Sequence, residues 1–422
     1  MQDNLEYARS LDDADELKHF REKFHIPYLD DRPCIYFCGN SLGLQPIMAE
    51  EFLQTEMDDW KNLGVEGHLH ASNPWLTYHK LLSPALANLC GADTQEVVAM
   101  NGLTVNLHLL LSSFYRPNKQ RFKIITEANA FSSDLYALQS QLEFHEVDIE
   151  NGLVTIQPQD GFLISEKDIL DAIDHHKNEL ALVFFGGVNY QSGQVLDMQK
   201  ITKAAHEAGA LAGFDLAHAI GNIKLDLHTW QVDFAAWCSY KYLNSGPGGT
   251  AGVFIHNRHL NGKLKPAFRG WWGHREEDRF QMHDQFIQAP GADAWQLSNA
   301  PILSMAVQRA SLQLFQEAGM DRIIEKSHSL TAYLEFLIKN LHNPDAQFGI
   351  EILTPPKSRG CQLSLKISGG AEALFEHMNR AGIMCDLRRP DIIRLAPVPL
   401  YNSYTEVYAV AQFLKKHCTY EK

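Results

Sequence analysis

The sequence has little positive charge. Its 37 lysines and arginines face 51 aspartates and glutamates, which gives a formal net charge of −14. Binding to nucleic acids normally requires a concentrated basic face, so this imbalance argues against a nucleic-acid partner. The chain also lacks a run of roughly 20 apolar residues, the length that a membrane span requires. We therefore expect neither nucleic acid nor membrane as a partner, and instead a substrate of modest size.

Cysteine is sparse and its positions show no pairing pattern. The seven cysteines are scattered and contain no C-x-x-C element, so the sequence predicts neither a disulfide framework nor a zinc ribbon. The 20 histidines show no H-E-x-x-H spacing, and we expect no metal site. The opening segment, MQDNLEYARS, lacks the basic and apolar regions of a signal peptide. These features together predict a cytoplasmic protein with reduced thiols.

The composition is typical of a folded globular chain, with 45% hydrophobic and 21% charged residues in 422. From about residue 80, short apolar runs alternate with helix-length amphipathic patterns. The runs 180–186 and 210–215 are examples of the first kind, and 165–176 and 197–209 of the second. Such alternation predicts an α/β fold with a mainly parallel sheet, helices on both of its faces and ligands at the carboxyl ends of its strands.

The pattern changes after Pro301, where two long helices precede strand-like segments at 361–367 and 392–397. This change predicts a smaller α+β unit at the C-terminal end. We expect three regions: an N-terminal arm associated with the small domain (1–60), a large cofactor-binding domain (61–310) and a small C-terminal domain (311–422). No internal repeat and no low-complexity linker marks these boundaries, so they depend on the change of pattern alone.

The strongest chemical signal lies in residues 213–256, where one predicted strand ends in Asp215 and the next ends near Lys241. A carboxylate at the first position can hydrogen-bond a protonated pyridine nitrogen, and a lysine at the second can form an imine with an aldehyde cofactor. On position alone, Asp215 could equally cap a turn and Lys241 could be a solvated lysine. However, Asp-x-x-His at 215–218, followed by Ser-x-Lys at 239–241 and a glycine-rich turn, resembles class V aminotransferases and their relatives. This context favours a site for pyridoxal 5'-phosphate.

Within that group the chain is similar to the kynureninases. The resemblance includes FCGNSLGLQP (37–46), TVNLHLLL (104–111), GFDLAHA (213–219), WCSYKYLN (237–244), GWWGH (270–274), SNAPI (298–302) and RLAPVPLYNS (394–403). These blocks span the chain and keep their order, which a chance match to one motif does not do. The resemblance implies a fold type I pyridoxal-phosphate enzyme. Its expected reaction is hydrolysis of kynurenine or 3-hydroxykynurenine to anthranilate or 3-hydroxyanthranilate and L-alanine, in tryptophan catabolism and NAD biosynthesis.

The resemblance also implies a set of cofactor contacts. Thr104 would meet the phosphate at a helix start, where anions are favoured, although it could also serve only as a helix cap. Phe131 would stack on the pyridine ring, with core packing as the alternative. Catalysis is expected of Lys241, Asp215 and Tyr240, the last as a proton donor. The full implied set is Leu103, Thr104, Phe131, Ser132, Ser133, Asp134, Asp215, His218, Tyr240, Lys241, Trp271 and Asn299.

For the substrate, the resemblance implies that Arg394 holds the amino-acid carboxylate, whereas a surface salt bridge is its alternative. His68 and Asn299 match residues of family members that accept the 3-hydroxylated ring, so we expect 3-hydroxykynurenine to be the better substrate. Trp271 and Asn299 match positions that reach the cofactor from the neighbouring subunit. The resemblance therefore implies a homodimer with shared sites.

One position departs from the family. Gly186 stands where a serine or threonine is usual, so a hydroxyl contact to the cofactor phosphate is missing, and water or a backbone amide would replace it. The alternative function is that of a cysteine desulfurase or selenocysteine lyase of the same fold. Such an enzyme needs an exposed, mobile cysteine, and Cys238 lies inside a predicted strand. A scaffold without activity is disfavoured because Lys241, Asp215 and Arg394 are all present.

Overall fold

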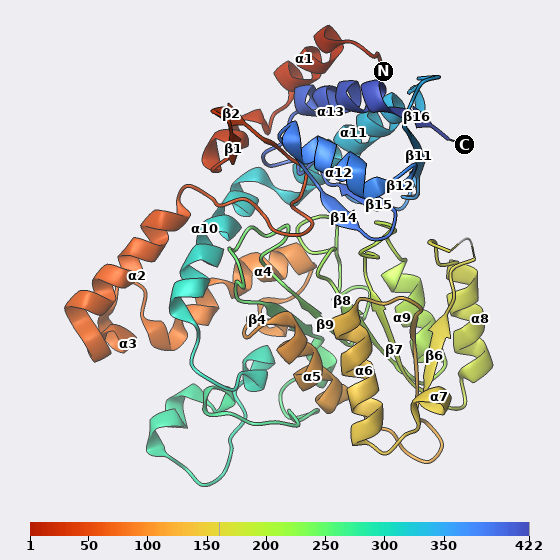
Figure 1. Ribbon diagram of the computed structural model, residues 1–422. Coiled ribbons are helices and arrows are strands. Elements are labelled where there is room, and N and C mark those ends of the chain that lie inside the picture. The colour runs from red at the N-terminus through yellow and green to blue at the C-terminus, as the bar shows by residue number, and fades with distance from the viewer. Residues whose placement is uncertain (160, 422) are drawn as a thin grey trace.

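The computed structural model of the chain describes residues 1–159 and 161–421. Its largest unit is a seven-stranded sheet with the strand order β4-β10-β9-β8-β7-β5-β6 (Figure 1). Neighbouring strands from β9 through β6 in this order are parallel, whereas β10 is antiparallel to both β4 and β9. The expected mainly parallel sheet is confirmed, with β10 as a strand that the sequence patterns did not single out.

Helices cover both faces of this sheet because its strands are apolar on both sides. In β7, Val183 and Phe185 pack with α8 and α9 in one core, while Leu182 and Phe184 pack with α5 and α6 in another. The strands are β4 (Val97–Ala99), β5 (Lys123–Glu127), β6 (Leu153–Ile156), β7 (Leu180–Gly186), β8 (Leu211–Asp215), β9 (Phe234–Trp237) and β10 (Gly252–Ile255). The helices are α4 (Ser83–Cys90), α5 (Leu103–Phe114), α6 (Ser132–Phe144), α7 (Ile149–Gly152), α8 (Glu166–His176) and α9 (Met198–Glu207).

A second, five-stranded sheet has the order β14-β15-β12-β11-β16 and forms the expected smaller α+β unit. Its strands are β11 (Phe348–Ile352), β12 (Leu363–Ser368), β14 (Asp386–Arg388), β15 (Ile392–Leu395) and β16 (Cys418–Tyr420). It packs with α11 (Met320–Lys339), α12 (Ala371–Arg380) and α13 (Tyr404–His417) around a separate apolar core. The fold class predicted from the sequence is thus confirmed.

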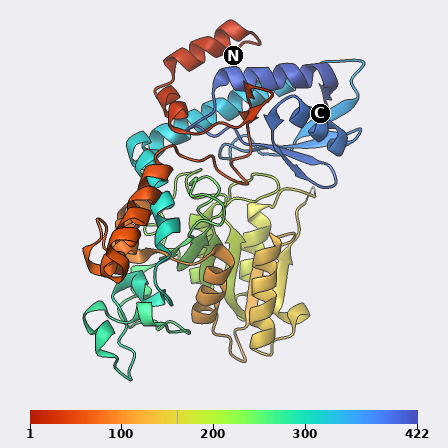
Figure 2. The same cartoon turned by 60° about the vertical axis from the view of Figure 1, so that its left-hand side comes forward.

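The N-terminal segment joins this smaller unit. Helix α1 (Leu5–Ala14) lies beside α13 (Figure 2). The Asp12 carboxylate accepts from the backbone N–H groups of Tyr404 and Thr405 at the start of α13. Strand β3 (Ile35–Tyr36) pairs in parallel with β13 (Ile383–Met384). The predicted boundaries at 60/61 and 310/311 stay predictions, and the second falls inside α10 (Ile302–Ala318).

The remaining elements complete the connections. Helix α2 (Ala49–Leu63) packs along α10 and leads into α3 (Gly67–His70), and β1 (Tyr28–Leu29) forms a small hairpin with β2 (Arg32–Pro33). Short 3-10 helices span 18–23, 64–66, 75–81, 94–96, 257–259, 271–273, 276–281 and 291–295. Throughout the described part of the chain, no helix combines the length and apolar character needed to cross a bilayer.

Candidate active site

A cavity of about 340 Å³ opens at the carboxyl ends of the parallel strands. Parallel pairing of β8 with β9 brings Asp215 and the segment after β9 to this same edge of the sheet. Nine of the residues predicted to bind the cofactor line the cavity: Leu103, Thr104, Phe131, Ser133, Asp134, Asp215, His218, Tyr240 and Lys241. Gly186, the departure from the family pattern, lines it as well.

Lys241 lies at the centre of this group. Its Nζ is 3.0 Å from His218 Nε2 and 5.7 Å from the centroid of the Phe131 ring. Burial lowers the pKa of His218 well below its ordinary value, and the positive charge of Lys241 lowers it further. His218 is therefore a neutral imidazole that can accept a hydrogen bond at Nε2, and its buried Nδ1 has no hydrogen-bond partner within the described residues.

Three buried carboxyl groups form one wall of the cavity. Burial raises the pKa of Asp215, although the charge of Lys241 partly offsets this effect. Burial also raises the pKa of Asp134 well above its ordinary value, and the nearby charge of Asp215 adds to it. Burial likewise raises the pKa of Glu127, to about 7. These acids lie too close together to ionise independently of one another.

These residues fit pyridoxal phosphate. Helix α5 begins at Leu103, which lines the cavity, and its N-cap, Gly102, supplies no side chain that would compete for the free amide groups of the helix start. A Cβ atom at Gly102 would meet nothing within 4 Å, so there is space for an anion at this helix end. The acid wall suits a protonated ring nitrogen, and Lys241 supplies an amine for an aldehyde.

Glu127 and Tyr190 are the cavity residues with polar side chains that sequence reasoning missed. Glu127 is the last residue of β5, and its carboxylate accepts from Asn189 Nδ2 at 2.7 Å and from the Gly186 amide at 3.3 Å. Tyr190 follows β7, and its ring lies edge-on to Phe131 with centroids 5.2 Å apart. An acid at the end of an apolar strand, the signal that identified Asp215, was available for Glu127 too. No motif marked Tyr190.

The departure at Gly186 has a local physical counterpart. A Cβ atom at this position would lie 3.2 Å from Glu127 Oε1, which is closer than most Cβ contacts. The carboxylate of Glu127 therefore occupies the space beside Gly186 into which a serine or threonine side chain would extend. The backbone amide of Gly186 remains a donor at this position, and it is directed to Glu127.

Four predicted site residues lie outside the cavity. Trp271 is 44% exposed, and its indole N–H donates to the carbonyl of Arg279. Asn299 and Ser132 are exposed, the latter as the first residue of α6. His68 lies on α3 with its ring edge-on to Trp75. Their proposed roles remain predictions.

Arg394 also lies outside the cavity, and it is fully buried. Its Nε and Nη2 are both 2.9 Å from Asp386 Oδ1, and its Nη1 donates to the carbonyl of Tyr190 at 2.6 Å. The alternative of a surface salt bridge is therefore wrong, because this ion pair is enclosed by the fold. Through Tyr190, the guanidinium contacts the wall of the cavity.

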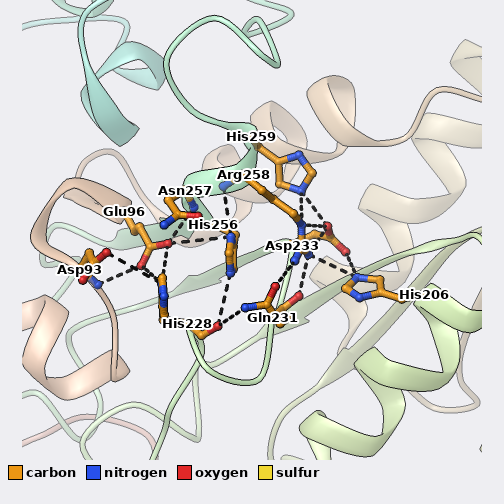
Figure 3. A network of polar contacts seen from close by, with 10 residues as sticks. All are labelled: Asp93, Glu96, His206, His228, Gln231, Asp233, His256, Asn257, Arg258 and His259. Carbon is orange, nitrogen blue, oxygen red and sulfur yellow. Dashed lines mark hydrogen bonds and ion pairs between the residues drawn. The ribbon is translucent and has the colours of Figure 1, made fainter.

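The opposite, amino edge of the sheet carries a second polar cluster (Figure 3). Within the described residues, Glu96, His228 and His256 form a group with metal-ligand atoms close together. The two imidazole rings are stacked at an interplanar angle of 10°, so their in-plane lone pairs do not converge on one point. His256 Nδ1 already accepts from the amide of Arg258. The group is a hydrogen-bonded network rather than a set of metal ligands.

Known proteins resemble this chain along almost its whole length. The Aminotransferase class-V family matches residues 51–373. A kynureninase from Myxococcus xanthus is 51% identical over 418 residues, covering 99% of this chain and 98% of that protein. The chain belongs to the kynureninase family. A second kynureninase, from Flavobacterium psychrophilum, is 50% identical, with 98% of each chain covered. The predicted family, enzyme class and cofactor, pyridoxal phosphate, are thereby confirmed.

Solved structures outside the kynureninases share the fold. A cystine C-S lyase in complex with cysteine persulfide has a TM-score of 0.76 at 18% identity, covering 91% of this chain and 98% of that one. A cysteine desulfurase from Escherichia coli has a TM-score of 0.76 at 17% identity, covering 95% and 98%. In this kynureninase-family chain every cysteine is free and at least partly buried, and burial raises the pKa of Cys38 and of Cys238 to about 11. None is a reactive thiolate at neutral pH.

Proposed function

We propose that this member of the kynureninase family is a pyridoxal-phosphate-dependent hydrolase of L-kynurenine and 3-hydroxy-L-kynurenine. Its products are anthranilate or 3-hydroxyanthranilate together with L-alanine. The observation that carries the proposal is the convergence of Lys241, Asp215 and neutral His218 on one cavity. The same chain is about half identical to named kynureninases over nearly its full length.

Different residues of the cavity would hold different parts of the cofactor. Lys241 would hold its aldehyde carbon, the start of α5 with Thr104 its phosphate, and Asp215 its ring nitrogen, with Phe131 against the ring. When bound, pyridoxal phosphate supplies an electron sink for a carbanion beside the substrate amine. Asp215 contributes by keeping the ring nitrogen protonated. Asp134 contributes a hydrogen bond to the carboxylate of Asp215.

Proton transfers fall to side chains of this chain. Lys241 removes the substrate α-proton, and His218 Nε2, 3.0 Å from its Nζ, accepts a hydrogen bond from the amine and orients it in the cavity. Burial raises the pKa of Tyr240, which keeps its phenol protonated and able to donate to the alanyl Cβ once the carbon–carbon bond has broken. Water supplies the oxygen that ends in the anthranilate carboxyl group.

The exposed predicted residues support a homodimer. Trp271 shares its segment with Phe268, Phe280 and Met282, which are each more than half exposed, and a second copy of the chain can cover such an apolar surface. We propose that each copy supplies Trp271, Asn299 and His68 to the cavity of the other, and that His68 and Asn299 favour the 3-hydroxylated substrate. Sedimentation of the purified protein tests the dimer directly. Mixing Lys241→Ala with Trp271→Ala chains should restore part of the activity through one intact shared site.

We also propose that the enzyme works in the cytoplasm. All seven cysteines are free, and free thiols persist in a reducing compartment. Fractionation of cells that produce the protein at its native level tests this placement. Activity found chiefly outside the cytoplasmic fraction would contradict it.

The deciding experiment incubates the purified holoenzyme with kynurenine, 3-hydroxykynurenine and cysteine in parallel. We expect fluorescent aryl product and L-alanine from the first two, with the higher kcat/KM for the hydroxylated one. Lys241→Ala should lose turnover and the visible absorbance of the lysine-bound cofactor together. Alanine released from cysteine alone would support the desulfurase alternative, and normal turnover by Lys241→Ala would remove the central assignment.

A further inference from the structure

Strand pairing places one acid between two arginines in the smaller sheet. Strands β14 and β15 are antiparallel, and Asp386 lies directly opposite Arg394. Because side chains alternate between the faces of a strand, Arg388, two residues after Asp386, lies on the same face as both of them. The register of two short strands therefore brings together three charged side chains.

The charges of this group do not balance. Asp386 Oδ1 is 2.9 Å from Arg394 Nε and 2.9 Å from Arg388 Nε, and its Oδ2 accepts from Arg388 Nη2 at 3.2 Å. No other acid among residues 1–159 and 161–421 lies within ion-pair distance of either guanidinium. One carboxylate thus faces two guanidinium groups, which leaves one positive charge uncompensated beside the cavity. A partly buried cation of this kind favours binding of an anion.

The two arginines differ in what they can still bind. Arg394 is fully buried, and its donors are directed to Asp386, to the Tyr190 carbonyl and to Ser41 Oγ at 3.2 Å. The side chain of Arg388 is 36% exposed, and both of its contacts above are with Asp386. A planar guanidinium has five N–H donors, so Arg388 retains donors for a ligand.

Arg388 also lies close to the cavity. Its guanidinium carbon is 5.9 Å from the centroid of the Tyr190 ring, and Tyr190 lines the cavity wall. The charges of Arg394 and Arg388 both contribute to lowering the pKa of His218, after burial and Lys241. His218 in turn contacts Lys241. A ligand whose amine is at Lys241 can therefore present an adjacent anion to Arg388.

We propose that Arg388 is a second carboxylate-binding residue, which receives the substrate's α-carboxylate beside Arg394 and completes a group of two guanidiniums and two carboxylates. The inference rests on the proposed function, because it requires an α-amino acid whose amine is at Lys241. Arg394 orients Asp386 and Tyr190, and Arg388 presents the free donors. Only amino acids with a free α-carboxylate can use the free donors of Arg388.

The test compares Arg388→Gln with Arg389→Gln in the holoenzyme. Arg389 is the next residue, 74% exposed, and it pairs with Glu372 on the surface, so its replacement removes the same charge without removing the contact. We expect Arg388→Gln to raise the KM for 3-hydroxykynurenine about 10- to 100-fold with kcat changed less than about threefold, the size of a lost charge-assisted hydrogen bond. Arg389→Gln should leave both constants within about twofold.

An analogue separates carboxylate recognition from general damage. The amine that remains when the α-carboxyl group of kynurenine is removed should inhibit Arg388→Gln and the unmodified enzyme with the same Ki, measured through the change in cofactor absorbance. An equal loss of affinity for this amine, or an unchanged KM for the amino acid, would overturn the proposal. Arg388→Met keeps the apolar stem beside Tyr190, and it carries the same expectation should the glutamine variant not fold. An unmodified enzyme without turnover would instead defeat the proposed function.

Discussion

Buried carboxylates occur at both edges of the large sheet, and their surroundings shift the two groups' pKa values in opposite directions. At the carboxyl edge, burial raises the pKa of Asp215, Asp134 and Glu127, and the charge of Lys241 opposes this effect at the two aspartates. At the amino edge, burial alone would raise the pKa of Asp233. There the hydrogen bonds from two histidines and the charge of Arg258 instead hold it well below its ordinary value (Figure 3).

The difference lies in the number of donors around each acid. Asp233 accepts from His206 Nε2 at 2.8 Å, from His259 Nε2 at 2.7 Å and from the Ala212 amide at 2.7 Å, and it pairs with Arg258. Among the described residues, Asp215 accepts from the amide of Ala217, and a side-chain hydrogen bond with Asp134, itself an acid, also lowers its pKa. Folding stability favours the first arrangement, so the second persists where a ligand completes it. The acids of the amino edge therefore stabilise the fold, and we call this the stability edge. The acids of the carboxyl edge serve the reaction, and we call this the chemical edge.

The largest expected effect comes from removing the charge at the chemical edge. Asp215→Asn should lower kcat by about 10³-fold, because an amide cannot keep the ring nitrogen of the cofactor protonated. Its free energy of unfolding without cofactor should be equal to or above that of the unmodified chain, since a poorly compensated acid is removed. Turnover assays and urea denaturation of the cofactor-free protein measure the two quantities. Turnover above a tenth of normal would contradict the assignment.

The same substitution at the stability edge, Asp233→Asn, should reduce folding stability and leave activity almost unchanged. Asp233→Asn breaks a fully buried, compensated ion pair, and we expect a loss of about 3–5 kcal/mol in unfolding free energy. Activity per folded molecule should stay within about twofold, because Asp233 lies at the amino end of β9, away from the cavity.

The pH dependence of this loss follows from the lowered pKa of Asp233. The stabilisation is complete above the unfolded-state pKa of about 3.9 and disappears as pH falls through the lower folded-state value. Urea denaturation from pH 3 to pH 7 should therefore show a steeper acid limb for the unmodified chain than for Asp233→Asn. Equal limbs would mean that the folded-state pKa of Asp233 is not depressed.

At Glu127 the dependence of folding stability on pH should have the opposite sign to that at Asp233, and the variant Glu127→Gln tests this. The folded-state pKa of about 7 exceeds the ordinary glutamate pKa of 4.5, so the unmodified cofactor-free protein loses stability as pH rises between these values. The difference corresponds to about 3 kcal/mol. We expect Glu127→Gln to lack this decline, so that its stability relative to the unmodified chain improves from pH 5 to pH 8.5. Denaturation at several pH values without cofactor measures it, and parallel curves would contradict it.

The sequence was sufficient for those features that depend on local pattern. Asp215 and Lys241 follow apolar runs of strand length, and parallel strands carry such residues to one edge. It was insufficient where the arrangement depends on register or on distant segments. The partner of Arg394 follows from the pairing of β14 with β15, and the donors around Asp233 come from segments separated by more than 40 residues. Neither leaves a periodic signal in the chain.

Glu127 is an intermediate case. Its place at the end of β5 is as visible in the sequence as that of Asp215, but the importance of the position depends on Gly186, the last residue of the neighbouring strand β7, and on Asn189 just after that strand. The residues Trp271, Asn299 and His68 are the ones whose predicted roles the structure of one chain explains least. Their proposed partner is a second chain, so one chain alone supplies no contact that explains them.

The smallest expected effect concerns His228, at the stability edge. Its hydrogen bond to Glu96 raises its pKa, although burial acts in the other direction, and the side chain is 36% exposed, so solvent screening limits the gain to under about 1 kcal/mol. A raised histidine pKa stabilises the fold below the unfolded value of about 6.5, and this contribution disappears as pH rises through the folded value. His228→Gln should thus be less stable than the unmodified chain at pH 5.5 and nearly equal to it at pH 8.5, with unchanged kcat.

Glu127→Gln should differ from the unmodified chain most at the alkaline end, so urea denaturation of both variants at these two pH values compares the edges directly. A His228→Gln deficit that grew with pH would show that Glu96 and His228 are not coupled by charge, and the contrast between the edges would then depend on Asp233 alone.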